Sequence, residues 1–211
     1  GYNYAIGSHN LKSRQDSKAT QIEPAPYNLD GTGILVGQWD NGLPLLTHQD
    51  YGGRITAGEA GSTHSHSTHV AGTILGSGAG NASAGGYAKA ATMVAYSWNG
   101  DPMGEQRTAK NQHYMDHNNH SWGQIVPSSQ YSTYQGMAPE FDLDARDFLM
   151  IGTKSAGNDG QNSTTSHGGY GFDSLAPDST VKNLIVIGAH DDSGDLASFS
   201  SRGPCDDGRI K

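Results

Sequence analysis

The stretch Ile34-Leu35-Val36-Gly37-Gln38-Trp39-Asp40-Asn41-Gly42 decides the fold expected for this 211-residue chain. It opens with a short apolar run rich in β-forming residues and lies between two glycine-containing turns, a pattern that predicts a buried strand. Asp40 comes at the carboxyl end of this strand. Asp-Asn-Gly is favourable turn chemistry, so a structural cap and a functional carboxylate are both open at this position.

Three more apolar runs, at residues 92–98, 148–153 and 184–188, predict further strands. Helices are expected at residues 68–75 and 104–117, where helix-compatible residues continue without a breaker. Strands that alternate with helices form a parallel sheet covered on both faces. We therefore predict an α/β fold of three layers with a mainly parallel central sheet. In such sheets ligands bind beyond the carboxyl ends of the strands.

The chain is expected to contain one main domain. Residues 1–30 are polar and mixed, and Pro24 and Pro26 stop any long helix, so this part predicts a surface lead-in with one short helix. Residues 31–211 then form a domain of ordinary size. Within it, the glycine-rich stretch 76–86 predicts a loop, and the polar stretch 124–139 predicts a surface insertion.

Composition excludes several classes of protein. The 13 basic and 21 acidic residues give a formal charge of −8, which disfavours nucleic acid and anionic membrane as partners. The single cysteine, Cys205, rules out an internal disulfide framework. No apolar run approaches the roughly 20 residues needed to cross a bilayer. Residues 1–4 lack the basic and apolar regions of a signal peptide, so we expect any such peptide to have been removed.

The strongest functional signal is His66-Ser67-Thr68-His69-Val70-Ala71-Gly72-Thr73-Ile74. His66 and His69 are three residues apart at the expected start of a helix, so they share a face. The apolar residues that follow anchor this helix to the core. A partly buried carboxylate such as Asp40 can hold an imidazole in one tautomer and stabilise its charged form, which is the basis of an acid–base pair.

A third segment, Ser155-Ala156-Gly157-Asn158-Asp159-Gly160, also follows an apolar strand. The side-chain amide of Asn158 can donate a hydrogen bond to a negative charge that develops on an oxygen. The alternative is a plain hairpin turn, because Gly-Asn-Asp-Gly is common turn chemistry.

These segments, in this order, resemble the subtilisin-type serine proteases of the subtilase family. The resemblance covers roughly residues 31–211, including the closing Phe199-to-Pro204 and Asp207-to-Lys211 stretches. It implies that Asp40 orients His66, that His66 is the general base, and that Asn158 stabilises the oxyanion; His69 would be a structural partner. The family usually has glycine where this chain has Ser67, and a backbone that required positive φ there would misplace His66 slightly.

The resemblance also implies how substrate binds. Ser121-Trp122-Gly123 is similar to the family segment that lines the specificity pocket, and Ser97-Trp98-Asn99-Gly100 would line the opposite side, with Ala156 and Gly157 completing the set. A protein or peptide substrate would then bind as an added β-strand. By the same resemblance the protein is secreted or extracellular and needs no cofactor. Calcium could serve as a structural ion, although no loop has a recognisable calcium-ligand spacing.

Attack on a peptide carbonyl also needs a nucleophile, and no segment resembling Gly-Thr-Ser-Met-Ala is present. The resembled family would continue into its serine helix after the last residues of this chain. We therefore expect the N-terminal part of a catalytic domain, incomplete at the C-terminus, with the serine beyond Lys211 or on a second chain. Alone, the chain is expected to have little activity. The alternative is an inactive protease fragment or a peptide-binding module.

A metal-based alternative rests on a set of histidines. Its members are His64, His66 and His69, with His120, His167 and His190 as further ligands. Neutral imidazoles around an open coordination position are typical of a zinc hydrolase. However, the aspartate usual inside such a histidine motif is absent here, and zinc ligation leaves the segments of Asp40 and Asn158 unexplained. A serine endopeptidase is therefore the favoured interpretation.

Overall fold

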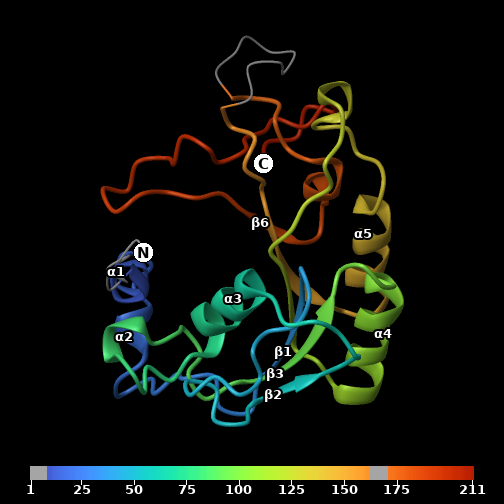
Figure 1. Ribbon diagram of the computed structural model, residues 1–211. Coiled ribbons are helices and arrows are strands. Elements are labelled where there is room, and N and C mark those ends of the chain that lie inside the picture. The colour runs from blue at the N-terminus through green and yellow to red at the C-terminus, as the bar shows by residue number, and fades with distance from the viewer. Residues whose placement is uncertain (1–8, 162–170) are drawn as a thin grey trace. The chain divides into compact units, whose positions relative to one another are not determined.

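The computed structural model describes residues 9–161 and 171–211, and the chain divides into two compact units, Gly1–Ser97 and Trp98–Lys211 (Figure 1). Each unit contains three strands that pair in parallel, together with helices. These pairings confirm the predicted α/β fold with a parallel sheet.

The first unit has the strand order β2-β3-β1. Its elements are α1 (His9–Asp16), α2 (Ala19–Ile22), β1 (Leu35–Asp40), β2 (Ile55–Ala57), α3 (Ser65–Leu75), the 3-10 turn η1 (Ala82–Ala84) and β3 (Thr92–Ser97). β1, β3 and α3 correspond to predicted elements. Strand β2 has no counterpart in the sequence-based prediction, because only Ile55 of its three residues is buried and the pattern is too short to show a period.

Strand β1 presents alternate side chains to opposite faces of its sheet. Val36, Gln38 and Asp40 share the face that α3 covers, since Val36 packs in the core with α3 and the other two side chains bond to α3. On the other face the ring of Trp39 stacks on Tyr96 of β3, with centroids 5.0 Å apart. The strand therefore turns one apolar and two polar side chains toward the same helix.

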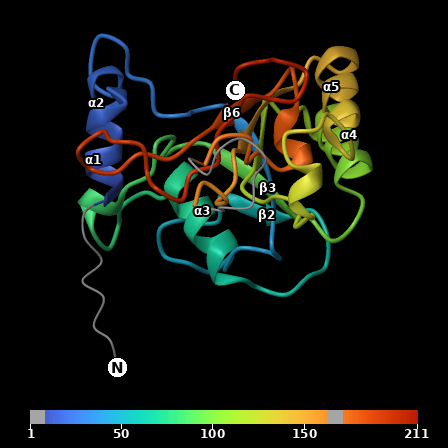
Figure 2. The same ribbon diagram turned by 90° about the horizontal axis from the view of Figure 1, so that it is seen from above.

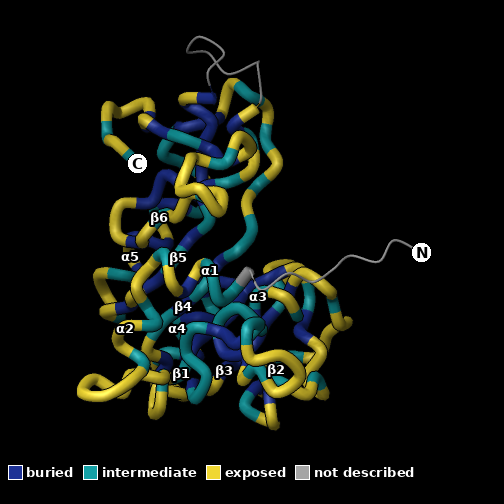
Figure 3. The backbone as a smooth tube through the Cα atoms, turned by 90° about the vertical axis from the view of Figure 1, so that its left-hand side faces the viewer, coloured by how far each residue is buried: buried dark blue, intermediate teal, exposed yellow. Residues whose placement is uncertain are grey.

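The core of the first unit lies between α3 and this face of the sheet. Figure 3 shows the buried backbone along β3, four of whose residues are buried. The buried apolar side chains of the cluster are Val36, Leu43, Tyr51, Ile55, Ala71, Leu75, Ala91, Met93 and Ala95. Because Ala71 and Leu75 are one turn apart, a single stripe of α3 fills this core.

The lead-in is more structured than predicted, because it forms two short helices in the described part, and α1 and α2 lie side by side (Figures 1 and 2). Arg14 of α1 is buried, and its Nε and Nη2 donate to the two carboxylate oxygens of Glu23 at 2.8 and 2.9 Å. Lys89 Nζ donates to the same carboxylate at 3.1 Å, and Arg14 Nη1 donates to the Gly85 carbonyl. These bonds tie the lead-in to the rest of the unit.

The second unit has the strand order β4-β5-β6. Its elements are α4 (Pro102–His113), β4 (His117–His120), η2 (Ser128–Gln130), α5 (Ala138–Asp147), β5 (Ile151–Ser155), η3 (Pro177–Thr180) and β6 (Ile185–Ile187). Helices α4 and α5 lie side by side (Figures 1 and 2). Their Met103 and Phe141 pack in one cluster with Val181, Leu184 and the partly buried Val186 of β6.

Strand β4 could not be recognised from its sequence, His-Asn-Asn-His, because it carries no apolar residue. Its buried Asn118 donates to Gln106 Oε1 at 3.1 Å, and Gln106 Nε2 donates to Asp144 Oδ2 at 2.6 Å. Arg107 Nε completes this network by donating to Asp144 Oδ1 at 2.7 Å. A buried polar strand is stable when its groups find partners in this way.

Other differences from the prediction have local causes. The 104–117 helix runs instead from Pro102 to His113, since Asp101 caps its start by accepting from Gly104 N at 3.0 Å. Strand β5 begins later than the apolar run at 148, because Leu149 has a φ of 52° and leaves the extended conformation.

The stretch 124–139 is not simply a surface insertion, and part of it is buried. The side chains of Tyr131 and Ser132 are buried, and Ser132 N donates to the Leu175 carbonyl at 2.7 Å. Helix α5, which starts at the end of this stretch, was not predicted either. Its buried Ala138 and Phe141 are interspersed with acidic residues that hide the apolar stripe in the sequence.

The helices of the described part are short, and the longest, α4, has 12 residues. Within residues 9–161 and 171–211, no helix has both the length and the apolar character that crossing a bilayer requires.

We expect Leu75→Ala to lower the free energy of unfolding by about 2–5 kcal/mol, because it opens a cavity where α3 meets the sheet. Leu29→Ala, at a leucine of the same unit that is 57% exposed, is the matched control and should cost less than about 1 kcal/mol. Urea unfolding followed by circular dichroism measures both. Equal losses would contradict the assigned core.

Glu23 makes stability depend on pH. Burial raises its pKa, but hydrogen bonds from Arg14 and Lys89 and their charges outweigh burial and hold the pKa below the ordinary value of 4.5. The unfolded chain therefore binds a proton at higher pH than the folded chain. The stabilisation is present above pH 4.5 and is lost as the pH falls through the lower, folded pKa. In urea titrations, the stability difference between the wild type and Glu23→Gln should shrink over this range; a constant difference would contradict this assignment.

Candidate active site

The central contact of the site joins β1 to α3. His66 Nδ1 lies 2.6 Å from Asp40 Oδ1. The Asp40 side chain is 1% exposed, whereas the His66 side chain is 50% exposed. A buried carboxylate thus holds one nitrogen of an imidazole whose ring reaches solvent.

Gly42 explains how the chain brings these two residues together. After β1 the chain turns at Gly42, whose φ is +79°. A Cβ at this position would lie 2.6 Å from the Ser62 carbonyl oxygen, so the approach of the two segments requires glycine. Leu43 N donates to Ser62 O at 2.9 Å and His64 N donates to Leu43 O at 2.8 Å. This pairing delivers the start of α3 beside Asp40.

His64 is used to start the helix. It is the N-cap residue of α3, and its Nδ1 accepts from His66 N at 3.2 Å. Its Nε2 lies 3.3 Å from Asn41 Nδ2, and its carbonyl accepts from Thr68 Oγ1 at 2.9 Å. Asn41 N in turn donates to Asp40 Oδ1 at 2.7 Å. His64 and Asn41 therefore connect the backbone of His66 to the carboxylate of Asp40.

Ser67 does not disturb the geometry of His66. It lies inside α3 and is not among the residues with positive φ, so no glycine is required there. Its side chain is fully buried, and Gln38 Nε2 donates to Ser67 Oγ at 2.8 Å and to the Ser67 carbonyl at 3.0 Å. Two side chains on the same face of β1 therefore bond to α3: Gln38 bonds to Ser67, and Asp40 bonds to His66.

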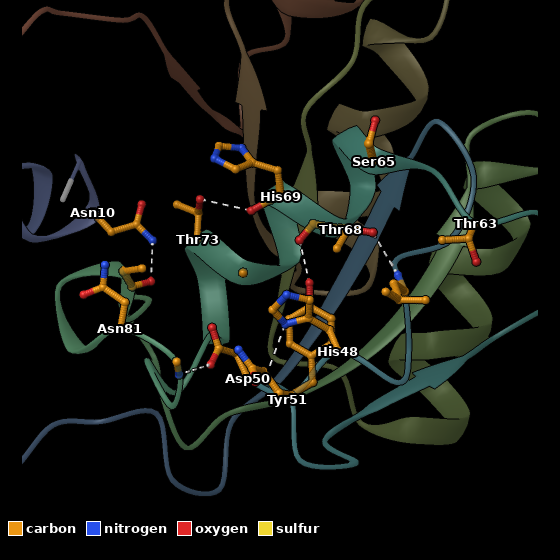
Figure 4. Close-up of a pocket in the computed structure, with 15 residues that line it drawn as sticks. Asn10, His48, Asp50, Tyr51, Thr63, Ser65, Thr68, His69, Thr73 and Asn81 are labelled. Carbon is orange, nitrogen blue, oxygen red and sulfur yellow. Dashed lines mark hydrogen bonds between the residues drawn. The ribbon is translucent and has the colours of Figure 1, made fainter. Parts of the chain in front are cut away.

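His69 follows His66 by about one turn of α3, and its side chain lines a cavity. Thr68 and Thr73 of the same helix also line this cavity of about 770 Å³ in the first unit, with His48 and Tyr51 on the facing loop (Figure 4). Tyr51 OH donates to the Thr68 carbonyl at 2.5 Å and holds that loop to the helix. His69 is therefore separate from the Asp40 contact.

The Asn158 segment is held in place by residues near the end of the chain. Gly157 has a φ of +111°, and its carbonyl accepts from Ser201 N at 2.9 Å. Ser201 Oγ accepts from Asp159 N at 3.0 Å, while Ala156 N donates to the Ile187 carbonyl. Asn158 itself is exposed, and within the described residues its amide makes no hydrogen bond. A fixed backbone thus presents an amide that can bind an incoming group.

The predicted substrate-binding segments come together in part. Within the second unit the rings of Trp98 and Trp122 stack with centroids 6.0 Å apart. Asn119 Nδ2 donates to Ser121 Oγ at 2.9 Å, and Ser155 Oγ donates to the Trp122 carbonyl at 3.1 Å. The Ser121–Gly123 segment therefore lies against the end of β5, just before Ala156. In the first unit, Ser97 N donates to Glu59 Oε1 at 2.5 Å.

The histidines do not form a metal site among the described residues, because no three His, Cys, Asp or Glu side chains there are grouped to hold an ion. His64 caps α3, and His66 bonds to Asp40. His120 is fully buried against the rings of Trp122 and Phe141, and burial lowers its pKa well below the ordinary value. His190 is exposed, and His167 lies outside the described residues.

Sequence reasoning missed the buried polar residues that support the site, namely Gln38, Lys154 and Asp178. For Gln38 and Lys154 the sequence does contain a signal that could have identified them. Gln38 interrupts the apolar run of β1, and Lys154 directly follows the strand predicted at residues 148–153. A polar residue at a buried strand position requires a partner, which the sequence alone does not name.

The sequence matches the Subtilase family over residues 46–211, which is more than half of the chain. No curated protein matches it in sequence.

Several solved structures share the fold. The CspB protease of Clostridium perfringens has a TM-score of 0.77 at 14% identity, with 95% of this chain and 79% of CspB covered. The prenylagaramide maturation protease PagA has a TM-score of 0.66 at 19% identity, with 93% and 64% covered. A cold-adapted subtilisin-like serine proteinase has a TM-score of 0.55 at 22% identity, with 84% and 62% covered. The chain therefore spans somewhat less than two thirds of the length of PagA. The family match over residues 46–211 shows that this chain belongs to the subtilase family of serine proteases.

Proposed function

We propose that this chain carries the aspartate and histidine of a serine endopeptidase that cleaves peptide bonds through an acyl-enzyme. The observation that carries the proposal is the 2.6 Å contact between His66 Nδ1 and the buried Oδ1 of Asp40. A carboxylate in this position keeps the proton on Nδ1 of the histidine and leaves Nε2 as the base. Within the described residues His66 Nε2 makes no hydrogen bond, so this nitrogen is available to a nucleophile.

The chemistry then follows in two halves. His66 Nε2 takes the proton of a serine hydroxyl as the serine oxygen bonds to the peptide carbonyl carbon. The imidazolium, stabilised by Asp40, returns the proton to the leaving amine, and the peptide C–N bond breaks. Water attacks the acyl-enzyme by the same route and releases the acid. The sequence contains no segment like the family's serine segment, so we propose that this serine is supplied from outside residues 1–211.

Asn158 is proposed to donate its side-chain amide to the oxyanion of the tetrahedral intermediate. Its flanking backbone is held by Ser201 and Ile187, so the amide would be oriented before the reaction begins. Preorganised donors are effective because no reorganisation is needed when the charge develops.

Peptide or protein substrate is proposed to bind as an extended strand along Ser121-Trp122-Gly123, with Trp98 to Gly100 on the opposite side. Backbone hydrogen bonds would supply general affinity, and side-chain pockets would supply specificity. The stacked rings of Trp98 and Trp122, one from each segment, would give the substrate an aromatic surface on this path.

Replacing His66 by alanine should lower kcat about 10⁶-fold, and Asp40→Asn should lower it by about 10⁴-fold, magnitudes established for the corresponding losses in serine proteases including a subtilisin. Hydrolysis of a fluorogenic peptide by the active enzyme measures both. His113→Ala, at an exposed histidine of α4, is the control and should leave kcat unchanged. Near-normal turnover by His66→Ala would transfer the role of base to His64 or His69.

Fluorophosphonate labelling would locate the serine, and a complete lack of labelling together with peptide binding would instead indicate a binding module.

The role of Asn158 is tested by Asn158→Ala. We expect kcat to fall about 10²–10³-fold while KM changes little, a magnitude established with a subtilisin. The amide acts on charge that exists only in the transition state, so ground-state binding should be spared. Asn183→Ala, at an exposed asparagine of the same unit, is the matched control and should leave kcat unchanged. A rise in KM at constant kcat would contradict the oxyanion role.

A further inference from the structure

Strand β5 places a lysine in the interior of the second unit, directly before the segment of Asn158. The side chain of Lys154 is fully buried, and so is that of Asp178 in η3. Lys154 Nζ lies 3.0 Å from Asp178 Oδ2. Burial lowers the pKa of Lys154, whereas the neighbouring Asp178 raises it. A buried ammonium of this kind needs both a counter-charge and hydrogen bonds.

The ammonium also contacts Trp122 in two ways. Lys154 Nζ donates a hydrogen bond to the Trp122 carbonyl, and it lies 4.7 Å from the centroid of the Trp122 ring. Ser155 Oγ donates to the same carbonyl at 3.1 Å. Two consecutive residues of β5 therefore hold a single backbone group of the Ser121–Gly123 segment.

Asp178 holds the same segment at a second point. Its Oδ1 accepts from Gln124 N at 3.3 Å. Trp122 O and Gln124 N thus both turn toward the buried ion pair, two residues apart, which is the repeat of an extended chain. In such a chain the backbone groups of the intervening residue, Gly123, turn to the opposite side. That side is the one an added substrate strand would use.

Stability alone does not explain this arrangement. A buried ion pair recovers little more than its own desolvation cost, and apolar side chains of similar volume often stabilise a core as well or better. The neighbouring apolar cluster of Phe141 and Val181 shows that this unit can fill its interior with hydrocarbon. What an apolar replacement could not supply is a donor to the Trp122 carbonyl and an acceptor for Gln124 N.

We propose that Lys154 and Asp178 are positioning residues that fix the backbone of the substrate-binding segment Ser121–Gly123 against β5. This inference rests on the proposed function, because it assumes that this segment binds the extended peptide. Because Lys154 is two residues before Ala156, the same strand would set the distance between bound substrate and the Asn158 amide.

The test uses the double variant Lys154→Met/Asp178→Asn, which removes the ammonium without leaving a buried carboxylate unpaired. We expect KM for a tetrapeptide amide substrate to rise about tenfold, with a smaller change in kcat, because backbone bonds to the substrate weaken. A capped single-residue ester, which does not reach along the segment, should keep its KM. Lys182→Met is the matched control: Lys182 is exposed and also lies over an aromatic ring, that of Tyr134 at 4.2 Å.

A second measurement does not depend on turnover. Backbone hydrogen exchange, followed by mass spectrometry, should accelerate about tenfold or more in residues 121–127 of the double variant, and should stay unchanged in 35–40. Unchanged exchange in 121–127 would overturn the proposal, as would faster exchange with the same KM for the tetrapeptide. Lack of hydrolysis and of labelling in the wild type would refute the proposed function instead. In that case the Kd of an uncleaved tetrapeptide replaces KM and decides the role of Lys154.

Discussion

The hydrogen bond between the buried carboxylate of Asp40 and the half-exposed imidazole of His66 depends on the alternation of β1. Side chains of a strand face opposite sides in turn, so Gln38 and Asp40 meet α3 while Trp39 faces away. A shift of one residue in the register of β1 would turn Trp39 toward His66 and carry both polar side chains to the other face. The parallel pairing of β1 with β3 fixes this register, residue for residue, from Leu35 to Asp40.

Both units place polar side chains at strand positions where a core would ordinarily be apolar. Gln38 in the first unit and Asn118 and Lys154 in the second are buried, and each has a partner in another element. An unpaired buried polar group costs more than the bond it could make, so each of these residues restricts how its strand and its neighbours can pack. Such groups contribute a defined geometry rather than added stability. Gln38 gives it to the helix that carries His66, and Lys154 gives it to the Ser121–Gly123 segment.

Proteins of very different sequence share the fold of this chain. Solved structures with 14–22% identity share the fold, so the arrangement of strands and helices tolerates replacement of most side chains. Close approaches of the backbone constrain the segments that contain Asp40 and Asn158. Gly42 and Gly157 both take positive φ beside a close neighbouring atom, and neither can be replaced without strain.

The sequence by itself determined the parallel α/β fold, the strand that ends at Asp40, the helix that starts near His66, and the family. These features follow from local patterns, because apolar runs, turn residues and short motifs consist of residues that are neighbours in the sequence. The residue pattern alone left His64, His66 and His69 equivalent as partners of Asp40, and only the family resemblance singled out His66. The tertiary structure shows the contact itself, because three histidines so close together in the sequence differ only in the direction their side chains take. Tertiary structure also decided that the polar β4 is a strand and that Lys154 is buried. A polar residue can be buried only where a partner distant in the sequence forms hydrogen bonds with it, and the local sequence does not identify that partner.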